Sequence, residues 1–306
     1  MRAAGGSFAR AWLPHALATV VLWGVWGAFS GISPQRGFPE TLVYCVWALT
    51  MIAPALVVLA QTGWRLDRSA RAIAYGLTVG LLGAGGQMIL FYAVARGPAY
   101  LIFPIISLSP VITIAMSFAL LGERTGRLGA VGILLALLAL PTFDYAPGGD
   151  GGAAAAWLLP AFLVMLCWGV QAYFMKAANN VMSAESIFVY MTVSALLLIP
   201  AAVAMTDFGR PINWGADGPG LAAAIQVLNA IGALTLVFAF RYGKAIIVAP
   251  LANAAAPLAT ALLSLVVLGV VPGVLKATGI GLALIASLLL AIEPDGADPA
   301  AQVADA

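Results

Sequence analysis

Two tryptophan-containing motifs have residue types and spacing that suit the binding of a flat or cationic solute. Trp23 and Trp26 are three residues apart, so they share one face of a helix, and Trp168 and Gln171 repeat that spacing in the second half of the chain. The face of an indole ring attracts cations and stacks on planar groups. We therefore predict that both motifs line a binding cavity. The alternative for each tryptophan is helix packing or anchoring at a membrane interface.

Further candidates are aromatic or amide side chains within long apolar segments. A buried hydroxyl or amide needs a hydrogen-bond partner, which either a solute or a neighbouring helix can supply. Both interpretations stay open for these residues. They are Tyr44, Trp47, Gln87, Tyr190, Asn229 and Asn253.

Other kinds of chemistry have little support in the sequence. All twelve Asp and Glu residues fall in predicted loops, helix ends or the C-terminal tail, and the lone His15 lies near the start of an apolar segment. There is no HExxH or GxSxG motif and no cluster of His, Cys and Asp. We therefore expect no enzyme activity, cofactor, metal ion or nucleic acid partner. A receptor or scaffold is disfavoured, because the predicted loops are too short to form partner-binding domains.

The composition indicates a membrane protein. The 306 residues are 63% hydrophobic and only 8% charged, whereas a soluble domain has about a quarter charged residues. We predict an all-α integral membrane protein in a lipid bilayer, because helices satisfy their own backbone hydrogen bonds there. Ten apolar stretches are close to the ~20 residues needed to cross a bilayer. They span 12–31, 40–61, 71–95, 98–121, 127–143, 155–176, 184–205, 219–240, 245–268 and 272–292.

The distribution of Lys and Arg predicts how the ten segments are oriented. With the N-terminus inside, ten basic residues fall on the inner side and four on the outer side, which is the bias that the positive-inside rule describes. Both termini are therefore expected to be cytoplasmic. The inner residues are Arg2, Arg10, Arg65, Arg68, Arg71, Arg124, Arg127, Lys176, Arg241 and Lys244, and the outer ones are Arg36, Arg96, Arg210 and Lys276.

The chain contains the same five-helix unit twice. Several segments recur in the same order at offsets between 145 and 147 residues, which isolated matches in an apolar chain would not do. The clearest pairs are WGV at 23–25 and 168–170, GPAYLIFP at 97–104 with GKAIIVAP at 243–250, and GILLALLA at 132–139 with GIGLALIA at 279–286.

Five is an odd number, so the second unit must enter the membrane from the opposite side. This is the inverted repeat of secondary transporters, whose solute sites lie near the midplane between the halves. We expect the first repeat over 1–145, the second over 153–292, and a disordered acidic tail over 293–306.

The whole pattern resembles the drug/metabolite transporter superfamily, EamA type. The resemblance rests on WG in the first and sixth segments, on GPAYLIFPIISLSPVITI and on LGERTGRLGAVGILL, and it covers about residues 12–292. It implies a solute carrier of the bacterial inner membrane, often an exporter of amino acids or other metabolites, but no particular substrate. The second repeat departs from the pattern, because Gly269-Val270-Val271 stands where the first has GER at 122–124.

We therefore expect a secondary carrier that works by alternating access, as an exporter or a facilitator, for an amino acid or a related zwitterion, aromatic ones included. The absence of a buried acid favours a zwitterionic or neutral solute, and the alternative is a carrier of organic cations or drugs coupled to protons. The segments 127–143 and 272–292 have no central polar residue and should lie at the periphery of a monomer or homodimer. Irregular backbone is expected near Asn253 and Ala254, because one extra residue separates the prolines there.

Overall fold

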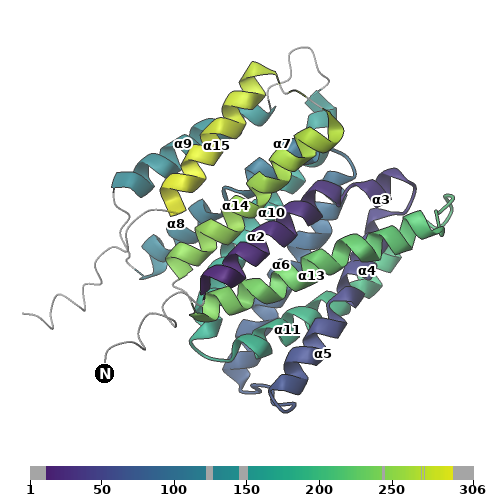
Figure 1. Ribbon diagram of the computed structural model, residues 1–306, viewed down its shortest axis with the longest axis vertical. Coiled ribbons are helices and arrows are strands. Elements are labelled where there is room, and N and C mark those ends of the chain that lie inside the picture. The colour runs from purple at the N-terminus through teal and green to yellow at the C-terminus, as the bar shows by residue number, and fades with distance from the viewer. Residues whose placement is uncertain are drawn as a thin grey trace, which may run out of the picture.

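The computed structural model describes residues 12–121, 127–144, 151–242, 245–269, 271 and 273–291. All regular structure in these residues is helical (Figure 1). The first half contains α2 (Trp12–Phe29), α3 (Ile32–Gln35), α4 (Glu40–Thr50), α5 (Ile52–Gln61), α6 (Ala70–Val94), α7 (Ala99–Ile106), α8 (Ser109–Leu121) and α9 (Arg127–Asp144). The second contains α10 (Gly151–Asn179), α11 (Ala184–Leu197), α12 (Ile199–Ala204), the π-helix η1 (Ala216–Gly220), α13 (Leu221–Tyr242), α14 (Ala245–Leu268) and α15 (Val274–Ala291).

These helices occupy the apolar stretches of the sequence and identify a multi-pass membrane protein. Within the described residues, six helical stretches are long and apolar enough to cross a bilayer: Trp12–Gln35, Glu40–Gln61, Ala70–Val94, Ala156–Asn179, Ala184–Ala204 and Ala216–Tyr242. Ten crossings and two cytoplasmic termini stay predictions. The GER turn at 122–124 and the tail at 293–306 lie outside the described residues.

Prolines interrupt several of the predicted segments. Helix α4 ends before Met51 and α5 follows with Pro54 in its first turn; α12 likewise begins just before Pro200, and α8 just before Pro110. Proline has no N–H and its ring collides with the carbonyl four residues earlier, so a helix breaks most easily there. Each break falls within one of the predicted membrane segments.

The prediction of irregular backbone near Asn253 and Ala254 is wrong, because α14 is helical throughout its length from Ala245 to Leu268. Its prolines are seven residues apart, at 250 and 257, which is close to two full turns of an α-helix. The extra residue is therefore absorbed by the regular helix, and no bulge is needed. The corresponding prolines at 104 and 110 are six residues apart, and there the chain breaks between α7 and α8.

The helices form a bundle with α2, α6, α10 and α13 at its centre (Figure 1). Helix α6 packs against α10 and α11, and α2 packs against α13 and α14. Helices α9 and α15 pack against each other at one margin of the bundle, away from α4, α5 and α11. The contacts of α6 with α10 and α11, and of α2 with α13 and α14, each join an element of the first half of the chain to one of the second half.

The glycine of each WGV motif makes the same close helix contact. The hydroxyl of Thr260 donates to the carbonyl oxygen of Gly24 at 3.1 Å, and that of Thr113 donates to the carbonyl oxygen of Gly169 at 2.8 Å. A Cβ on Gly24 would lie 2.9 Å from the Cβ of Ala259. Only glycine lets these helices approach so closely, which explains why it follows the tryptophan in both motifs.

Two ion pairs are also repeated, each between residues 56 positions apart. Glu40 accepts from Arg96 at 2.7 Å, and Glu185 accepts from Arg241 at 2.5 Å. Glu40 and Glu185 begin α4 and α11, where a carboxylate also favours the helix dipole. These partly exposed pairs contribute about 0–1 kcal/mol each. We use them to name the two ends of the molecule, the Glu40 end and the Glu185 end.

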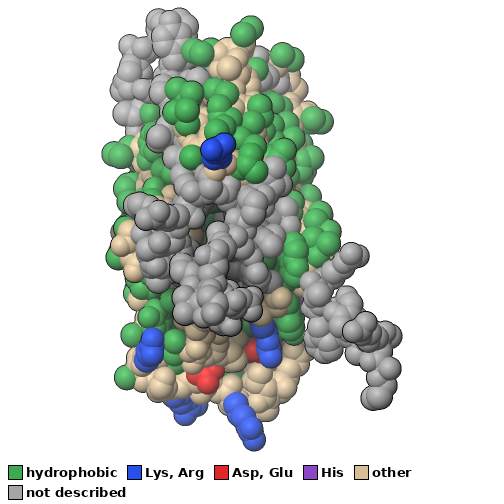
Figure 2. All heavy atoms as spheres, turned by 90° about the vertical axis from the view of Figure 1, so that its left-hand side faces the viewer, with side chains coloured by type: hydrophobic (Ala, Val, Ile, Leu, Met, Phe, Trp, Pro, Cys, Tyr) green, Lys and Arg blue, Asp and Glu red, His purple; other side chains and the backbone are tan. Residues whose placement is uncertain are grey.

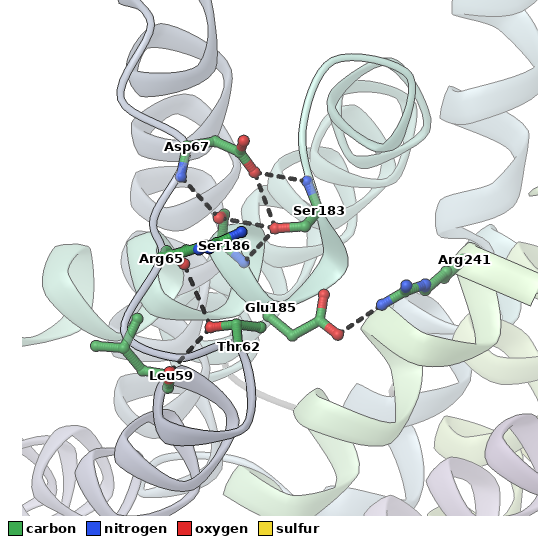
Figure 3. A network of polar contacts seen from close by, with 8 residues as sticks. All are labelled: Leu59, Thr62, Arg65, Asp67, Ser183, Glu185, Ser186 and Arg241. Atoms are coloured by element: carbon green, nitrogen blue, oxygen red, sulfur yellow. Dashed lines mark hydrogen bonds and ion pairs between the residues drawn. The ribbon is translucent and has the colours of Figure 1, made fainter.

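At the Glu185 end, Asp67 ties the first half of the chain to the second (Figure 3). Its carboxylate accepts the backbone N–H of Ser183 at 2.9 Å and the Ser183 hydroxyl at 2.8 Å. The backbone N–H of Asp67 donates to the hydroxyl oxygen of Ser186 at 3.0 Å, and its carbonyl oxygen accepts from the Tyr190 hydroxyl at 2.7 Å. These bonds close this end of the bundle at the start of α11.

At the Glu40 end, Asn213 makes the corresponding tie, 146 residues after Asp67. Its backbone N–H donates to the carbonyl oxygen of Gly37, and its side-chain amide donates to that of Arg36, both at 3.0 Å. Helices α4 and α5 run from Glu40 to the loop that carries Asp67, so the two ties lie at opposite ends of the bundle. In Figure 2, Lys and Arg side chains gather with Asp and Glu towards the bottom of the view, below a broad hydrophobic surface.

The glycines of α6 offer a matched test of helix contact. A Cβ on Gly80 would meet the side chain of Ser194 and lie 2.8 Å from the backbone oxygen of Tyr190, whereas a Cβ on Gly85 would meet nothing within 4 Å. We expect Gly80→Ala to lose about 1–3 kcal/mol of stability through overpacking, seen as a lower thermal unfolding temperature in detergent. Gly85→Ala should be neutral or stabilising by up to ~1 kcal/mol. Equal unfolding temperatures for the two variants would contradict the packing of α6 on α11.

The tie at Asp67 predicts a pH dependence. The backbone N–H of Ser183, followed by the hydroxyls of Ser183 and Ser186, holds the pKa of the Asp67 carboxyl below its ordinary value. The stability from these bonds is therefore fully present above the ordinary Asp pKa of about 3.9 and is lost as pH falls through the lower pKa of the folded state. Asp67→Asn should unfold at a lower temperature than the wild type at pH 7, and this difference should shrink as pH falls below about 3.9. A difference that stays constant over this range would argue against the tie.

Candidate functional site

A central cavity lies where α2, α4, α6, α10, α11 and α13 meet. Its volume is about 50 Å³, which is room for a few water molecules. Among its described lining residues there is no Asp, Glu, Lys or Arg. Seven of the predicted candidates line it: Trp23, Trp26, Trp47, Gln87, Trp168, Gln171 and Asn229.

The two tryptophans of the WGV motifs face each other across this cavity. The ring centroids of Trp23 and Trp168 are 6.5 Å apart, and their planes differ by 22°. Each ring lies against a glycine of the opposite half, Gly232 for Trp23 and Gly86 for Trp168, where any Cβ would collide with the indole. The repeated motif therefore supplies a pair of nearly parallel aromatic surfaces, one from each half of the chain.

A chain of hydrogen bonds fixes the direction of two amides in the cavity wall. The indole N–H of Trp47 donates to Asn229 Oδ1 at 3.0 Å, and Asn229 Nδ2 donates to Gln87 Oε1 at 3.3 Å. An indole N–H can only donate, so Asn229 must turn its oxygen towards Trp47 and its NH₂ towards Gln87. The buried Nε2 of Gln87 then has no partner among the described residues.

Gln171 is the opposite of Gln87, because its amide nitrogen is used in a hydrogen bond and its amide oxygen is left over. Its Nε2 donates to the backbone oxygen of Val79 at 3.1 Å, and the amide fits there because Gly83 has no side chain. A backbone carbonyl can only accept, so this bond assigns Nε2 to Val79 and leaves Oε1 as an acceptor. Among the residues that line the cavity, Gln87 thus has an unused buried donor and Gln171 has an acceptor.

Trp26 lies at the edge of the cavity in a packed aromatic layer. It is 2% exposed, and its indole N–H donates to Gln226 Oε1 at 2.9 Å. Its ring meets Phe91 and Phe103 edge-on, with centroids 6.5 and 6.1 Å away. Gln226 is not among the predicted candidates, although it precedes Asn229 by three residues on the same face of α13, and its Nε2 is also buried without a partner among the described residues.

Three predicted candidates do not join this arrangement. The hydroxyl of Tyr44 donates to the carbonyl oxygen of Ala195 at 3.0 Å, and that of Tyr190 donates to Asp67, so in the described structure both tyrosines bond neighbouring elements away from the cavity lining. The side chain of Asn253 lies outside the described residues. Both tyrosines join the two halves of the chain, which is the interhelical alternative.

Sequence reasoning also missed lining residues, namely Met51, Met191, Leu236 and Phe240. These apolar side chains have no sequence signal that separates a cavity surface from a lipid-facing one. The described residues hold no group of three or more His, Cys, Asp and Glu side chains that could bind a metal ion.

Comparisons with known proteins agree with this architecture. The model of the EamA-like transporter family matches the chain twice, over residues 10–141 and 155–292. An uncharacterized protein of Methanocaldococcus jannaschii is 24% identical over 124 residues, which are 40% of this chain and 89% of that protein. That relative is therefore about as long as one of the two matched segments.

A solved crystal structure shares the fold. It superposes with a TM-score of 0.66 over 91% of this chain and 95% of that chain, at 19% sequence identity. At this identity the likeness establishes the fold alone. The two family matches meet at the central cavity, since Trp23 and Gln87 come from the first and Trp168 and Asn229 from the second. The chain belongs to the EamA-like transporter family and is a membrane transporter of small solutes.

Proposed function

We propose that this protein is a secondary transporter that moves a small zwitterion of the amino-acid type by alternating access. In this proposal the solute binds between Trp23 and Trp168, the Gln87 amide donates to its carboxylate, and the Gln171 amide oxygen accepts from its ammonium group. The observation that carries the proposal is the unpartnered Nε2 of Gln87. The bonds from Trp47 to Asn229 and from Asn229 to Gln87 Oε1 fix the direction of this amide, so its Nε2 has no partner among the described residues. A buried donor without a partner costs about 1–3 kcal/mol, which a bound acceptor would recover.

The uncharged wall supports a solute with no net charge. An ion with no partner of opposite sign is costly to bring into an apolar site. A zwitterion brings both charges, and each meets a neutral amide of suitable polarity. Carriage of an organic cation coupled to protons is the second candidate, favoured by the aromatic pair, but no described acidic residue lines the cavity to balance the charge.

The matched contacts support two repeats in inverted orientation, over 1–145 and 153–292. The ion pair Glu40–Arg96 and the tie at Asn213 lie at one end, and their counterparts Glu185–Arg241 and Asp67 lie at the other. Alternating access then consists of releasing one tie while the other holds. The positive-inside bias supports the Glu185 end as the cytoplasmic one.

We further propose ten crossings with both termini cytoplasmic, in a bacterial inner membrane. The margin formed by α9 and α15 would face lipid in a monomer or the second copy in a homodimer. Export and facilitated diffusion are both compatible with the site.

Counterflow in proteoliposomes tests the proposal. The panel contains labelled amino acids, quaternary amines and nucleosides, with and without a pH gradient. We expect exchange of amino acids, with loss of at least 10-fold in Trp168→Ala because one aromatic wall is removed. Trp214→Ala is the matched control, since Trp214 is 64% exposed outside the cavity lining.

Two results would overturn this assignment. Exchange of quaternary amines that depends on the pH gradient would favour the cation carrier. Full amino-acid exchange by folded Trp168→Ala would show that the tryptophan pair packs the helices and does not bind the solute.

A further inference from the structure

A second cavity of about 300 Å³ lies at the Glu40 end of the bundle. It is bounded by the end of α2 and α3, by the turn between α6 and α7, and by the end of α14. We call it the Arg36 cavity; the residues used below are Ala28, Gly31, Gln35, Arg36, Val94 and Ser264. Its volume is several times that of the central cavity.

The Arg36 cavity contains polar groups that are not fully used within the protein. Ser264 is 1% exposed, and its hydroxyl has no partner among the described residues. One turn earlier on α14, Thr260 bonds the backbone of α2, so the serine is not needed to hold those helices together. The amide nitrogen of Gln35 lies over Gly31, 3.6 Å from the position a Cβ would take.

Arg36 brings the only full charge among the described residues of this cavity. Its nearest carboxylate oxygen belongs to Asp217 at 3.8 Å, and its side chain is 53% exposed, so the pair is loose. Its backbone is nevertheless held by the tie to Asn213. A loosely paired guanidinium, in a cavity that is also lined by a residue with an unpartnered hydroxyl, is a suitable receptor for a carboxylate.

The residues that line the two cavities come close together along α2 and α6. On α2, Trp26 lines the central cavity and Ala28 lines the Arg36 cavity. On α6, Gln87 lines the central cavity and Val94 lines the Arg36 cavity. These two residues are seven positions apart, which is about 10 Å along a helix. Phe91 lies between them and meets Trp26 edge-on, and Phe103 completes the layer.

The layer occurs in one half of the chain only. The positions 145 or 146 residues after Trp26 and Phe91 are Gln171 and Val237, which have no aromatic ring. Three rings therefore pack together towards the Glu40 end, whereas towards the Glu185 end Phe240 lines the cavity together with Gln171 and Met175. This difference between equivalent positions suits a gate that acts on one side.

We propose that the Arg36 cavity is a second solute site on the transport path, which receives the carboxylate of the zwitterion at Arg36 and Ser264, and that Trp26, Phe91 and Phe103 form the gate between the two sites. The inference rests on the proposed function, because it assumes a solute with a carboxylate. The gate opens when the tie at Asn213 is released, and the solute then passes from the tryptophan pair to Arg36.

Cysteine protection in nanodiscs tests the second site. Cys45 and Cys167 are replaced by alanine, and a single cysteine is placed at Ala28 for the Arg36 cavity or at Ala172 for the central cavity. The rate of labelling by a small thiol reagent is measured with L-phenylalanine, with phenylpropionate, which lacks the ammonium group, and with phenethylamine, which lacks the carboxylate. We expect L-phenylalanine and phenylpropionate, but not phenethylamine, to slow labelling of Ala28→Cys at least 3-fold. Arg36→Gln should abolish this protection and leave L-phenylalanine protection of Ala172→Cys in place.

The outcomes separate the two proposals. Protection at position 172 alone would overturn the second site and leave the proposed function standing. Protection at position 28 alone would support the second site and contradict the central one. Labelling that no compound slows at either position would overturn both.

The gate has its own measurement. Phe103→Leu and Phe103→Ala should raise the labelling rate of Ala172→Cys in increasing order, by about 10-fold for alanine, because the layer is thinned. Leu101→Ala, an equally buried position on α7, is the control and should leave the rate unchanged. An equal effect of Leu101→Ala would show general loosening of the bundle and contradict the gate.

Discussion

The hydrogen bond from the Trp47 indole to Asn229 is the constraint on which the candidate site depends. An indole nitrogen cannot accept, so this single bond sets the orientation of Asn229 and, through it, of Gln87. Asn229 also accepts the indole N–H of Trp23 at its backbone oxygen. One residue of α13 therefore aligns an aromatic wall from α2, a second indole from α4 and an amide from α6. A reversed amide would place two acceptors or two donors face to face in a buried setting, which is costly.

Close contact between rings and glycines couples this site to the fold. Trp23 lies on Gly232 and Trp168 on Gly86, so each aromatic wall is also the contact that joins the two halves of the chain. In the proposed transport cycle, opening of the cavity would slide these rings over glycine surfaces, where no side chain obstructs them. The polar ties at the two ends are exposed and individually weak, which suits bonds that have to break and form during a transport cycle.

The sequence predicted the parts of this structure that depend on local pattern or on duplication. Segment length and hydropathy located the helices, and the shared spacing of Trp23 and Trp168 placed them on facing walls. The sequence could not predict hydrogen bonds between residues that are distant in the chain. Nothing near Tyr44 indicates that its hydroxyl donates to the carbonyl oxygen of Ala195, 151 residues away. The spacing of the prolines in α14 led to a wrong prediction of irregular backbone, because a separation of seven residues fits a regular helix as well as a distorted one. The methionines that line the cavity are residues of the same type as those that face lipid, so the sequence does not distinguish them. The unpartnered Nε2 of Gln87 can be found only from the hydrogen-bond geometry of the folded protein.

The most direct measurement of the central claim is the binding preference for a carboxylate in a variant that lacks the orienting donor. Trp47→Phe keeps a buried aromatic ring and removes only the N–H and part of the ring. The ratio of the Kd values of phenethylamine and L-phenylalanine should fall about 10-fold from wild type to Trp47→Phe, because Asn229 and Gln87 are then free to turn and the donor is presented only part of the time. An unchanged ratio in a folded Trp47→Phe protein would contradict the account, since the amide direction would then not depend on Trp47.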